Sequence, residues 1–287
     1  MNIAADRLKA MAMMVIASVG ISFGGLIIRS MEAADTWQIN FYRAFFMILA
    51  VVLVMLVRYR RITAAQFKVI GTSGVVGAVM VAVAGMAFLQ AITTTTVANA
   101  LFTLSGIPFF TAAMAWLFLR EALPRATVIT MVIAAFGVMI MVGGGIEAGS
   151  WYGNAMALVT ALCFSAYATI IRRSRGVDMM PVLILSSILI IAVAVAVKDD
   201  DLAIPLHDIF LCFLLGGVLS GSGNAMFIWA ARHLAAAELT LFMLLEFALG
   251  PIWVWIFINE VPRAMTLVGG GIVIGAVAAR TLLERKR

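Results

Sequence analysis

The sequence predicts an all-α integral membrane protein with ten transmembrane helices in two inverted five-helix repeats. Three observations predict this fold. The 287 residues are 64% hydrophobic and 12% charged, with a mean hydropathy of +1.11, whereas soluble domains are roughly 45–50% apolar and about 25% charged. Apolar runs long enough to cross a bilayer recur along the whole chain. The two halves of the chain also resemble each other in sequence.

Turn residues and charges divide the apolar sequence into ten predicted helices. These are 11–29, 37–57, 68–90, 95–118, 124–145, 151–171, 180–197, 207–231, 235–258 and 262–282. The first has the basic start and apolar middle of a cleaved signal peptide. It is long enough to span and matches a later segment, so we interpret it as a transmembrane helix. No room remains for a separate soluble domain.

The positive charges predict the orientation. Short linkers such as 120–125 and 259–263 make successive helices antiparallel neighbours. With ten spans, sixteen of the 20 lysines and arginines fall on one side, and only Arg29, Lys198 and Arg263 fall on the other. The positive-inside rule then predicts cytoplasmic N- and C-termini, in what we expect to be a bacterial inner membrane. This distribution explains the pI of 9.8 without nucleic acid as a partner.

An internal repeat relates the two halves. "FLQAITTTTVANALF", from Phe88, aligns with "FIWAARHLAAAELTL", from Phe227, at an offset of 139 residues that pairs Asn99 with Glu238. Because each half holds five helices, an odd number, the second half must enter the membrane inverted. Inverted repeats are typical of secondary transporters, whose substrate site lies near the midplane. A duplication that merely enlarged the bundle is the structural alternative.

A second alignment covers the start of each half. At an offset of 143 residues "ISFGGLIIR" matches "FSAYATIIR", which pairs Ser22 with Ser165. A proline in the middle of a span is followed thirteen residues later by a glutamate, then by a short turn into a glycine-containing helix. The residues of this pattern are Pro108, Glu121, Pro124 and Gly137.

On this pattern, and on the preceding "FLQAITTTTVANALF", the chain resembles the EamA-type branch of the drug/metabolite transporter superfamily. The resemblance implies two five-helix repeats, residues 1–146 and 147–287, around a central cavity. It also implies export of amino acids or other small metabolites. The second half departs from the pattern, because Phe247 stands where Pro108 is expected and the proline comes later, at Pro251. This departure argues against a symmetric pair of kinks.

Two ionisable residues lie well inside predicted spans, away from the ends: Glu246 in the ninth and Arg43 in the second. Such residues are costly in a bilayer and usually face a cavity or a partner. Phe242 and Trp253 lie on the same helical face as Glu246, which fits an amine or aromatic group through charge pairing and cation–π contact. The alternatives are proton exchange at Glu246, an ion pair with Arg43, and a protonated carboxyl that donates a hydrogen bond.

The repeat favours a functional role for Glu246, because its counterpart in the first half is Ile107. A residue found in one half only is not demanded by the shared scaffold. Glu238 is expected near the cytoplasmic end of the same helix, where solvation at the interface explains it best and gating or coupling is the alternative. Asn99, its repeat mate, is expected near the outer end of the fourth helix.

Three further residues are candidates. Asn224 lies in the glycine- and serine-rich eighth span, where close helix packing is favoured over a locally unwound, substrate-binding stretch. Pro108 and Pro251 each remove a backbone donor and are predicted hinges or kinks.

Several classes of site are excluded or weakly supported. The sequence has no CxxC or HExxH pattern, so we expect no metal site, and Cys163 and Cys212 are interpreted as small apolar residues. The glycine runs at 143–149 and 269–275 lack the lysine of a phosphate-binding loop. We therefore expect no cofactor and no ATPase motor.

The interpretation is a secondary transporter, an exporter of a small metabolite, with an amino acid or related amine favoured. A proton or a counter-substrate is the expected coupling partner, and the oligomeric state is open. Three alternatives remain. The first is a flippase for a lipid-linked small group, and the second is a non-transporting receptor. The third is a membrane-embedded enzyme using Glu238 and His233, which are five residues apart and do not face one another well on a helix.

Overall fold

The computed structural model describes residues 3–60, 64–95, 97–143, 151–198, 201–259 and 264–285. Within these ranges every regular element is helical, which confirms the all-helical class. The helices are α1 Ile3–Ile21, α2 Gly24–Arg29, α3 Thr36–Tyr59, α4 Ala64–Val69, α5 Gly71–Thr94, α6 Val97–Leu104, α7 Ile107–Leu119, α8 Arg125–Gly143, α9 Trp151–Arg173, α10 Met180–Lys198, α11 Leu206–Phe213, the π-helix η1 Leu214–Ser220, α12 Gly221–Ala230, α13 Ala236–Ile258 and α14 Ala264–Arg285.

Eight helical stretches of the described chain are long and apolar enough to cross a membrane. They are Ala5–Arg29, Thr36–Tyr59, Gly71–Thr94, Trp151–Arg173, Met180–Lys198, Leu206–Ala230, Ala236–Phe257 and Ala264–Leu282. Two further apolar helices, Ile107–Leu119 and Arg125–Ile140, are shorter. The chain is therefore a multi-pass membrane protein, and the count of ten spans stays a prediction.

Three predicted spans are interrupted helices. The first breaks at Ser22–Phe23, between α1 and α2, and the fourth breaks at Ser105–Gly106, between α6 and α7. The eighth changes to π-helical geometry over Leu214–Ser220. Glycines accompany each interruption, and Pro108 follows the second break in the first turn of α7, where its missing N–H has no helical partner to lose.

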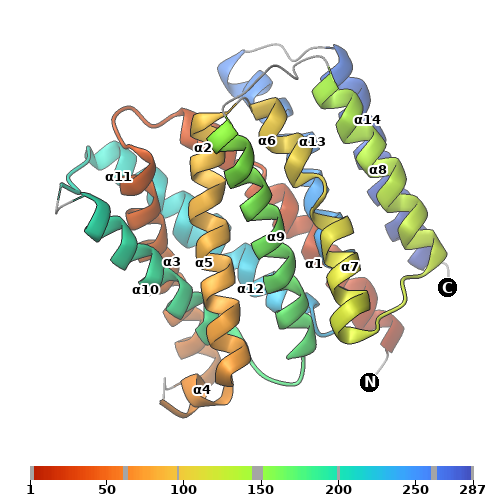
Figure 1. The fold of residues 1–287 in the computed structure, drawn as a ribbon, viewed down its shortest axis with the longest axis horizontal. Coiled ribbons are helices and arrows are strands. Elements are labelled where there is room, and N and C mark those ends of the chain that lie inside the picture. Colours follow the sequence, from red (N-terminus) through yellow and green to blue (C-terminus); the bar gives the residue numbers. More distant parts are fainter. Residues whose placement is uncertain are drawn as a thin grey trace.

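The long helices pack in pairs (Figure 1). Helix α5 packs on α9, α8 on α14, α3 on α10 and α1 on α12. The largest buried cluster joins α1, α3, α5, α9, α10, α12, α13 and α14, and a second joins α6, α7, α8, α9, α13 and α14. Helix α13 contributes several residues to each cluster, so it connects the two. We call the end of the bundle where α1 begins and α14 ends the termini end.

The two halves repeat some details of backbone geometry. Helix α7 ends at Arg120 and α13 ends at Asn259, both in the left-handed conformation that commonly terminates helices. These two residues are 139 positions apart, the offset of the sequence alignment.

Glycine brings two main chains into direct contact beside the second span. A Cβ added at Gly216 in η1 would overlap the carbonyl oxygen of Arg43 in α3. A Cβ added at Gly221 would lie 2.8 Å from Cβ of Ala50, also in α3. Helices α3 and α11–η1–α12 thus approach closely because these positions have no side chain.

Candidate functional site

Glu246 lies in the middle of α13, about 15 Å from Ala236 at the helical rise of roughly 1.5 Å per residue. Its side chain is partly exposed. Within the described ranges its carboxylate has no hydrogen bond and no ion pair. The ion pair with Arg43 that the sequence offered as a structural explanation is therefore not formed.

Exposure changes along the face of α13 that carries Glu246. Toward the termini end Leu239 and Phe242 are buried in the largest core cluster. Toward the other end Gly250 and Trp253 are partly exposed. Phe242 therefore packs in the core, whereas Trp253 shares the exposure of Glu246. Glu246 thus lies at the point along this face of α13 where buried side chains give way to partly exposed ones.

The break between α1 and α2 faces this part of α13. The indole N–H of Trp253 donates to the Ser22 hydroxyl at 2.7 Å. The ring of Trp253 stacks on Phe23, with the ring centroids 4.3 Å apart and an interplanar angle of 16°. A Cβ added at Gly250, one turn after Glu246, would lie 3.8 Å from the Ser22 carbonyl oxygen. The aromatic pair and the acid thus share one helical face beside an interrupted helix.

Two helix breaks and one proline lie at similar distances from the termini end. Pro251, inside the continuous helix α13, is about 22 Å from Ala236, and Ser22 is about the same distance along the first span from Arg7, at about 1.5 Å per residue. The break before α7 is about 20 Å from Leu119. In many secondary transporters, discontinuous helices near the bilayer midplane form the substrate site.

Arg43 lies in a different group of helices. Its Nη2 is 3.2 Å from Oδ1 of Asn40 and 3.4 Å from the carbonyl oxygen of Gly85 in α5. No carboxylate of the described residues lies within 4 Å of its guanidinium. No described hydrogen bond joins this group to Glu246. The structure thus places the two predicted charges at separate points of the bundle.

Asn224 supports the packing interpretation of the eighth span. Its Nδ2 donates to the carbonyl of Ser220, at 2.9 Å, within a continuous helix. A Cβ added at Gly223, beside it, would lie 2.6 Å from Cδ1 of Ile21. The glycines of this segment therefore serve close contact between helices. The main chain of Asn99 lies in α6, and its side chain lies outside the described part of the structure.

Glu238 corrects the sequence interpretation. Solvation at the interface was expected, but the residue is 1% exposed. Its carboxylate accepts hydrogen bonds from Arg7 at 2.7 Å, Arg280 at 2.9 Å and Thr127 at 3.1 Å. The amide N–H of Ala235 donates to it at 3.2 Å, as in a capping box. Four helices, α1, α8, α13 and α14, thus meet on one buried acid at the termini end.

Two more polar contacts join distant segments near the same end. Arg172 of α9 pairs with Glu121 at 2.7 Å and also donates to the carbonyl of Ala231 at 2.9 Å. The hydroxyl of Tyr59 donates to Asp178. The Arg172–Glu121 and Tyr59–Asp178 contacts connect one half of the chain to the other, so polar bonds help to hold the termini end together.

Sequence reasoning missed Arg7, Arg280 and Thr127. The two arginines were counted as topology markers, and Thr127 has no motif around it. Ser22 was seen only as a repeat position, and one serine in an apolar stretch does not by itself indicate a helix break. In the sequence, the signal for the Glu238 cluster was the glutamate itself, because a buried carboxylate needs hydrogen-bond donors or a counter-ion.

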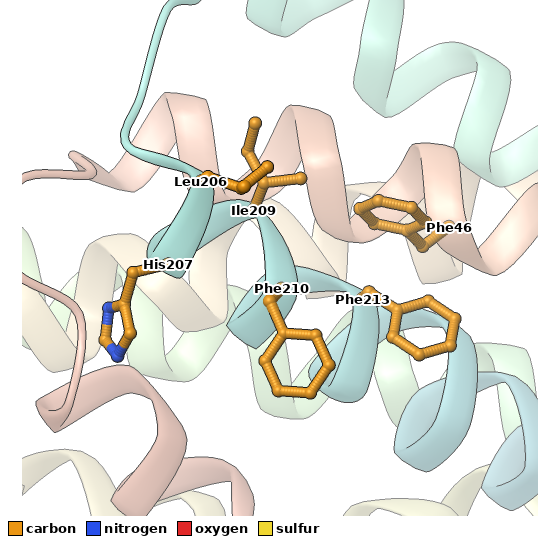
Figure 2. A pocket seen from close by; sticks show the side chains of 6 residues that line it. All are labelled: Phe46, Leu206, His207, Ile209, Phe210 and Phe213. Atoms are coloured by element: carbon orange, nitrogen blue, oxygen red, sulfur yellow. The ribbon is translucent and has the colours of Figure 1, made fainter.

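An apolar groove of about 640 Å³ lies elsewhere, on the outer side of α11 (Figure 2). Phe46, Leu206, His207, Ile209, Phe210 and Phe213 line it. It contains none of the predicted site residues, and its aromatic side chains are spread over an open surface. Among the described residues no group of three or more metal-ligating side chains is clustered.

Comparisons with known proteins give the family. A family model described as the EamA-like transporter family matches this chain twice, over residues 8–143 and 151–281. The chain is 26% identical over 176 residues to the pseudopaline exporter CntI of Pseudomonas aeruginosa strain PAO1, and equally to that of strain UCBPP-PA14. The match covers 60% of this chain and about three fifths, 61%, of each exporter's length.

A solved structure gives the fold. A crystal structure described only as that of a protein superposes on this chain with a TM-score of 0.78. It is 17% identical in sequence and covers 97% of this chain and 98% of its own. At this identity the similarity concerns the fold alone.

Proposed function

Because this chain belongs to the EamA-like transporter family, a branch of the drug/metabolite transporters, we propose that it exports a small metabolite by alternating access. An amino acid or a related amine is the proposed substrate. The similarity to pseudopaline exporters supports the direction of transport. The sequence has no nucleotide-binding loop, so an ion gradient or exchange with a counter-substrate would drive uphill export.

The proposed architecture is ten spans in two inverted repeats, residues 1–146 and 147–287. The two matches of the family model support it. Equivalent contacts support it as well: Ser22 bonds to Trp253 of α13, while its repeat mate Ser165 donates to the carbonyl of Ile107 in α7, at 3.1 Å. The basic residues near the termini end support cytoplasmic termini in a bacterial inner membrane.

One observation carries the assignment of the site. Glu246 is an acid in the middle of a membrane helix, without a partner among the described residues, and is partly exposed beside Trp253. An anion there attracts a cationic group, and the indole and phenyl faces nearby suit the same group. We therefore propose that Glu246 binds the substrate's amine or exchanges a proton against it.

Efflux from loaded proteoliposomes tests this function. Individual amino acids and their decarboxylated amines are enclosed, and their release is followed with wild-type protein, Glu246→Gln and Glu32→Gln. The last variant is the matched control, because Glu32 is exposed. We expect at least one compound to be exported by wild type and by the control. We expect Glu246→Gln to lower that rate at least about tenfold, or about 1.4 kcal/mol.

A folded Glu246→Gln variant with the wild-type rate and pH dependence would refute the role of this acid. Translocation of a lipid-linked group without release of any soluble solute would favour the flippase instead. The enzyme alternative loses its proposed pair, because Glu238 is held by two arginines and the His233 ring packs against Trp229, with centroids 4.6 Å apart. Members of this family are transporters.

A further inference from the structure

Arg43 is a cation inside the bundle without a carboxylate partner among the residues that the structure describes. It lies about 10 Å along α3 from Thr36, in a helix long enough to cross the membrane. A charge at such a depth normally pairs with an opposite charge. An acid on the neighbouring helix α11 is already engaged: Asp208 accepts from the amide N–H groups of Glu32, Ala33 and Ala34 at 2.9–3.0 Å. Arg43 therefore needs an anion from elsewhere.

The guanidinium of Arg43 keeps most of its donors. Only Nη2 has described hydrogen bonds, to Asn40 and to Gly85, and both are long, at 3.2 and 3.4 Å. Arginine carries five N–H donors in a planar fork that matches a carboxylate. Arg43 is partly exposed as a whole residue, and the proposed site requires that a small solute reach this fork.

Two unpartnered donors accompany it. Asn40 is fully buried. Its Oδ1 accepts a hydrogen bond from Arg43, and its Nδ2 has no partner among the described residues. Ser187 of α10 is also fully buried and its hydroxyl has no described partner. It lies one turn before Ile190, whose side chain faces Gly85 next to Arg43. An unsatisfied buried donor is costly, so each needs an acceptor.

The backbone around this cluster is unusual in the same place. The π-helix η1 packs its Gly216 directly on the main chain of Arg43. Gly85 leaves room for the guanidinium, because a Cβ there would lie 3.0 Å from Nη2. Segments of π-helix occur often at functional sites. The cluster thus combines a cation, an amide N–H and a hydroxyl with an unusual backbone. Each of these three groups can donate a further hydrogen bond to an anion.

We propose that Arg43, Asn40 and Ser187 form a membrane-embedded site for a carboxylate, supplied by the transported solute. The guanidinium would take the carboxylate through its free fork, with the amide and hydroxyl as further donors. The inference rests on the proposed function only in naming the solute as the source of the anion. It predicts that acidic solutes are distinguished from their decarboxylated counterparts.

The binding test uses acetate as the probe and needs no transport. Thermal unfolding of the purified protein in neutral detergent is measured during titration with sodium acetate, at an ionic strength kept constant with sodium methanesulfonate, which carries no carboxylate and is replaced stepwise. We expect acetate to raise Tm saturably for wild type and for Arg175→Gln, a control at an exposed arginine. We expect no such rise for Arg43→Gln. An undiminished rise in Arg43→Gln, or no rise in wild type, would overturn the proposal.

A second variant guards against misfolding of Arg43→Gln. Asn40→Asp keeps the arginine and supplies an internal carboxylate beside it, so we expect it to fold and to lose the response to acetate. Retention of the full response would contradict the site. Chloride titration separates the sources of negative charge: an equal stabilisation by chloride would show a halide site and not a carboxylate site.

The transport arm distinguishes this site from Glu246. In proteoliposomes an exported amino acid is compared with its decarboxylated amine. We expect Arg43→Gln to slow the amino acid at least about tenfold and to leave the amine within about twofold, whereas Glu246→Gln slows both. Equal losses for both compounds in Arg43→Gln would refute the carboxylate role. If neither compound is exported by wild type, the proposed function fails, and the acetate titration still decides the site.

Discussion

Helix α13 carries two glutamates eight residues apart, and their surroundings are opposite. Glu238 is buried and accepts hydrogen bonds from two arginines, a threonine and an amide. Glu246 has no described partner and is partly exposed. An acid whose lone pairs are all occupied holds helices together, while an acid with free lone pairs in a bilayer is available to a ligand or a proton. The difference separates a structural from a functional carboxylate on one helix.

The largest expected effect is on stability. Glu238→Ala removes the buried carboxylate that pairs with Arg7 and Arg280, so we expect a loss of about 3–5 kcal/mol in the free energy of unfolding. Glu246→Ala removes a charge that has no partner among the described residues, so we expect a change within about 1 kcal/mol of wild type. Chemical unfolding in detergent measures both. Equal losses in the two variants would remove the distinction between the acids.

A smaller effect is expected at Trp253. Trp253→Phe keeps a ring for stacking on Phe23 but removes the N–H that bonds Ser22. We expect a loss of about 1 kcal/mol, the usual net value of one hydrogen bond, with a raised KM for efflux. Trp255→Phe is the matched control, because Trp255 is exposed on the same helix. The same KM in both variants would exclude Trp253 from the substrate face.

The smallest effect is expected at the opposite end of the bundle. Lys198 pairs with Asp35 at 2.6 Å, but the Asp35 side chain is 44% exposed. Partial burial raises the pKa of Asp35, yet the hydrogen bonds from Lys198 and from the amides of Gln38 and Trp37 outweigh it, and the pKa lies below 3.8. A lowered pKa stabilises the fold above the unfolded value, and this contribution is lost as the pH falls through the folded value.

We therefore expect Lys198→Met to cost less than about 1 kcal/mol at neutral pH. The difference from wild type should shrink below about pH 4, as Asp35 becomes protonated. Unfolding measured between pH 3 and 7 checks this. If Lys198→Met lowered the free energy of unfolding as much as Glu238→Ala does, solvent exposure would not explain the difference between the ion pairs at the two ends of the bundle.

Much of the fold follows from hydrophobic patterning. The predicted second, third, sixth and seventh spans coincide with α3, α5, α9 and α10 to within about four residues. The interruptions were not predicted at Ser22 or Ser105, because an apolar stretch with one serine and a glycine has nearly the same mean hydropathy as an unbroken helix. Hydropathy measures transfer into the bilayer, and a break depends on which neighbouring groups satisfy the free backbone.

The site was predictable in part, for the same reason. Glu246 and Arg43 stand out because a single charge is rare in a span. The partners of Glu238 do not stand out, since Arg7 and Arg280 lie 231 and 42 positions away from it along the chain. Only the packing of four helix ends brings them together. The same holds for Asn40 and Ser187, whose unpaired donors are visible only once their neighbours are placed.

The contact of Gly216 with the main chain of Arg43 constrains how the bundle can move. Two backbones in direct contact have no side chains between them that could adjust, so we expect α3 and η1 to move together. The breaks at Ser22–Phe23 and Ser105–Gly106 are then the expected points of bending, and bending at the first would change the contacts of Ser22 and Phe23 with Trp253. The proposed carboxylate site at Arg43 would then keep its geometry during the transport cycle, while the part of the bundle around Glu246 opens and closes.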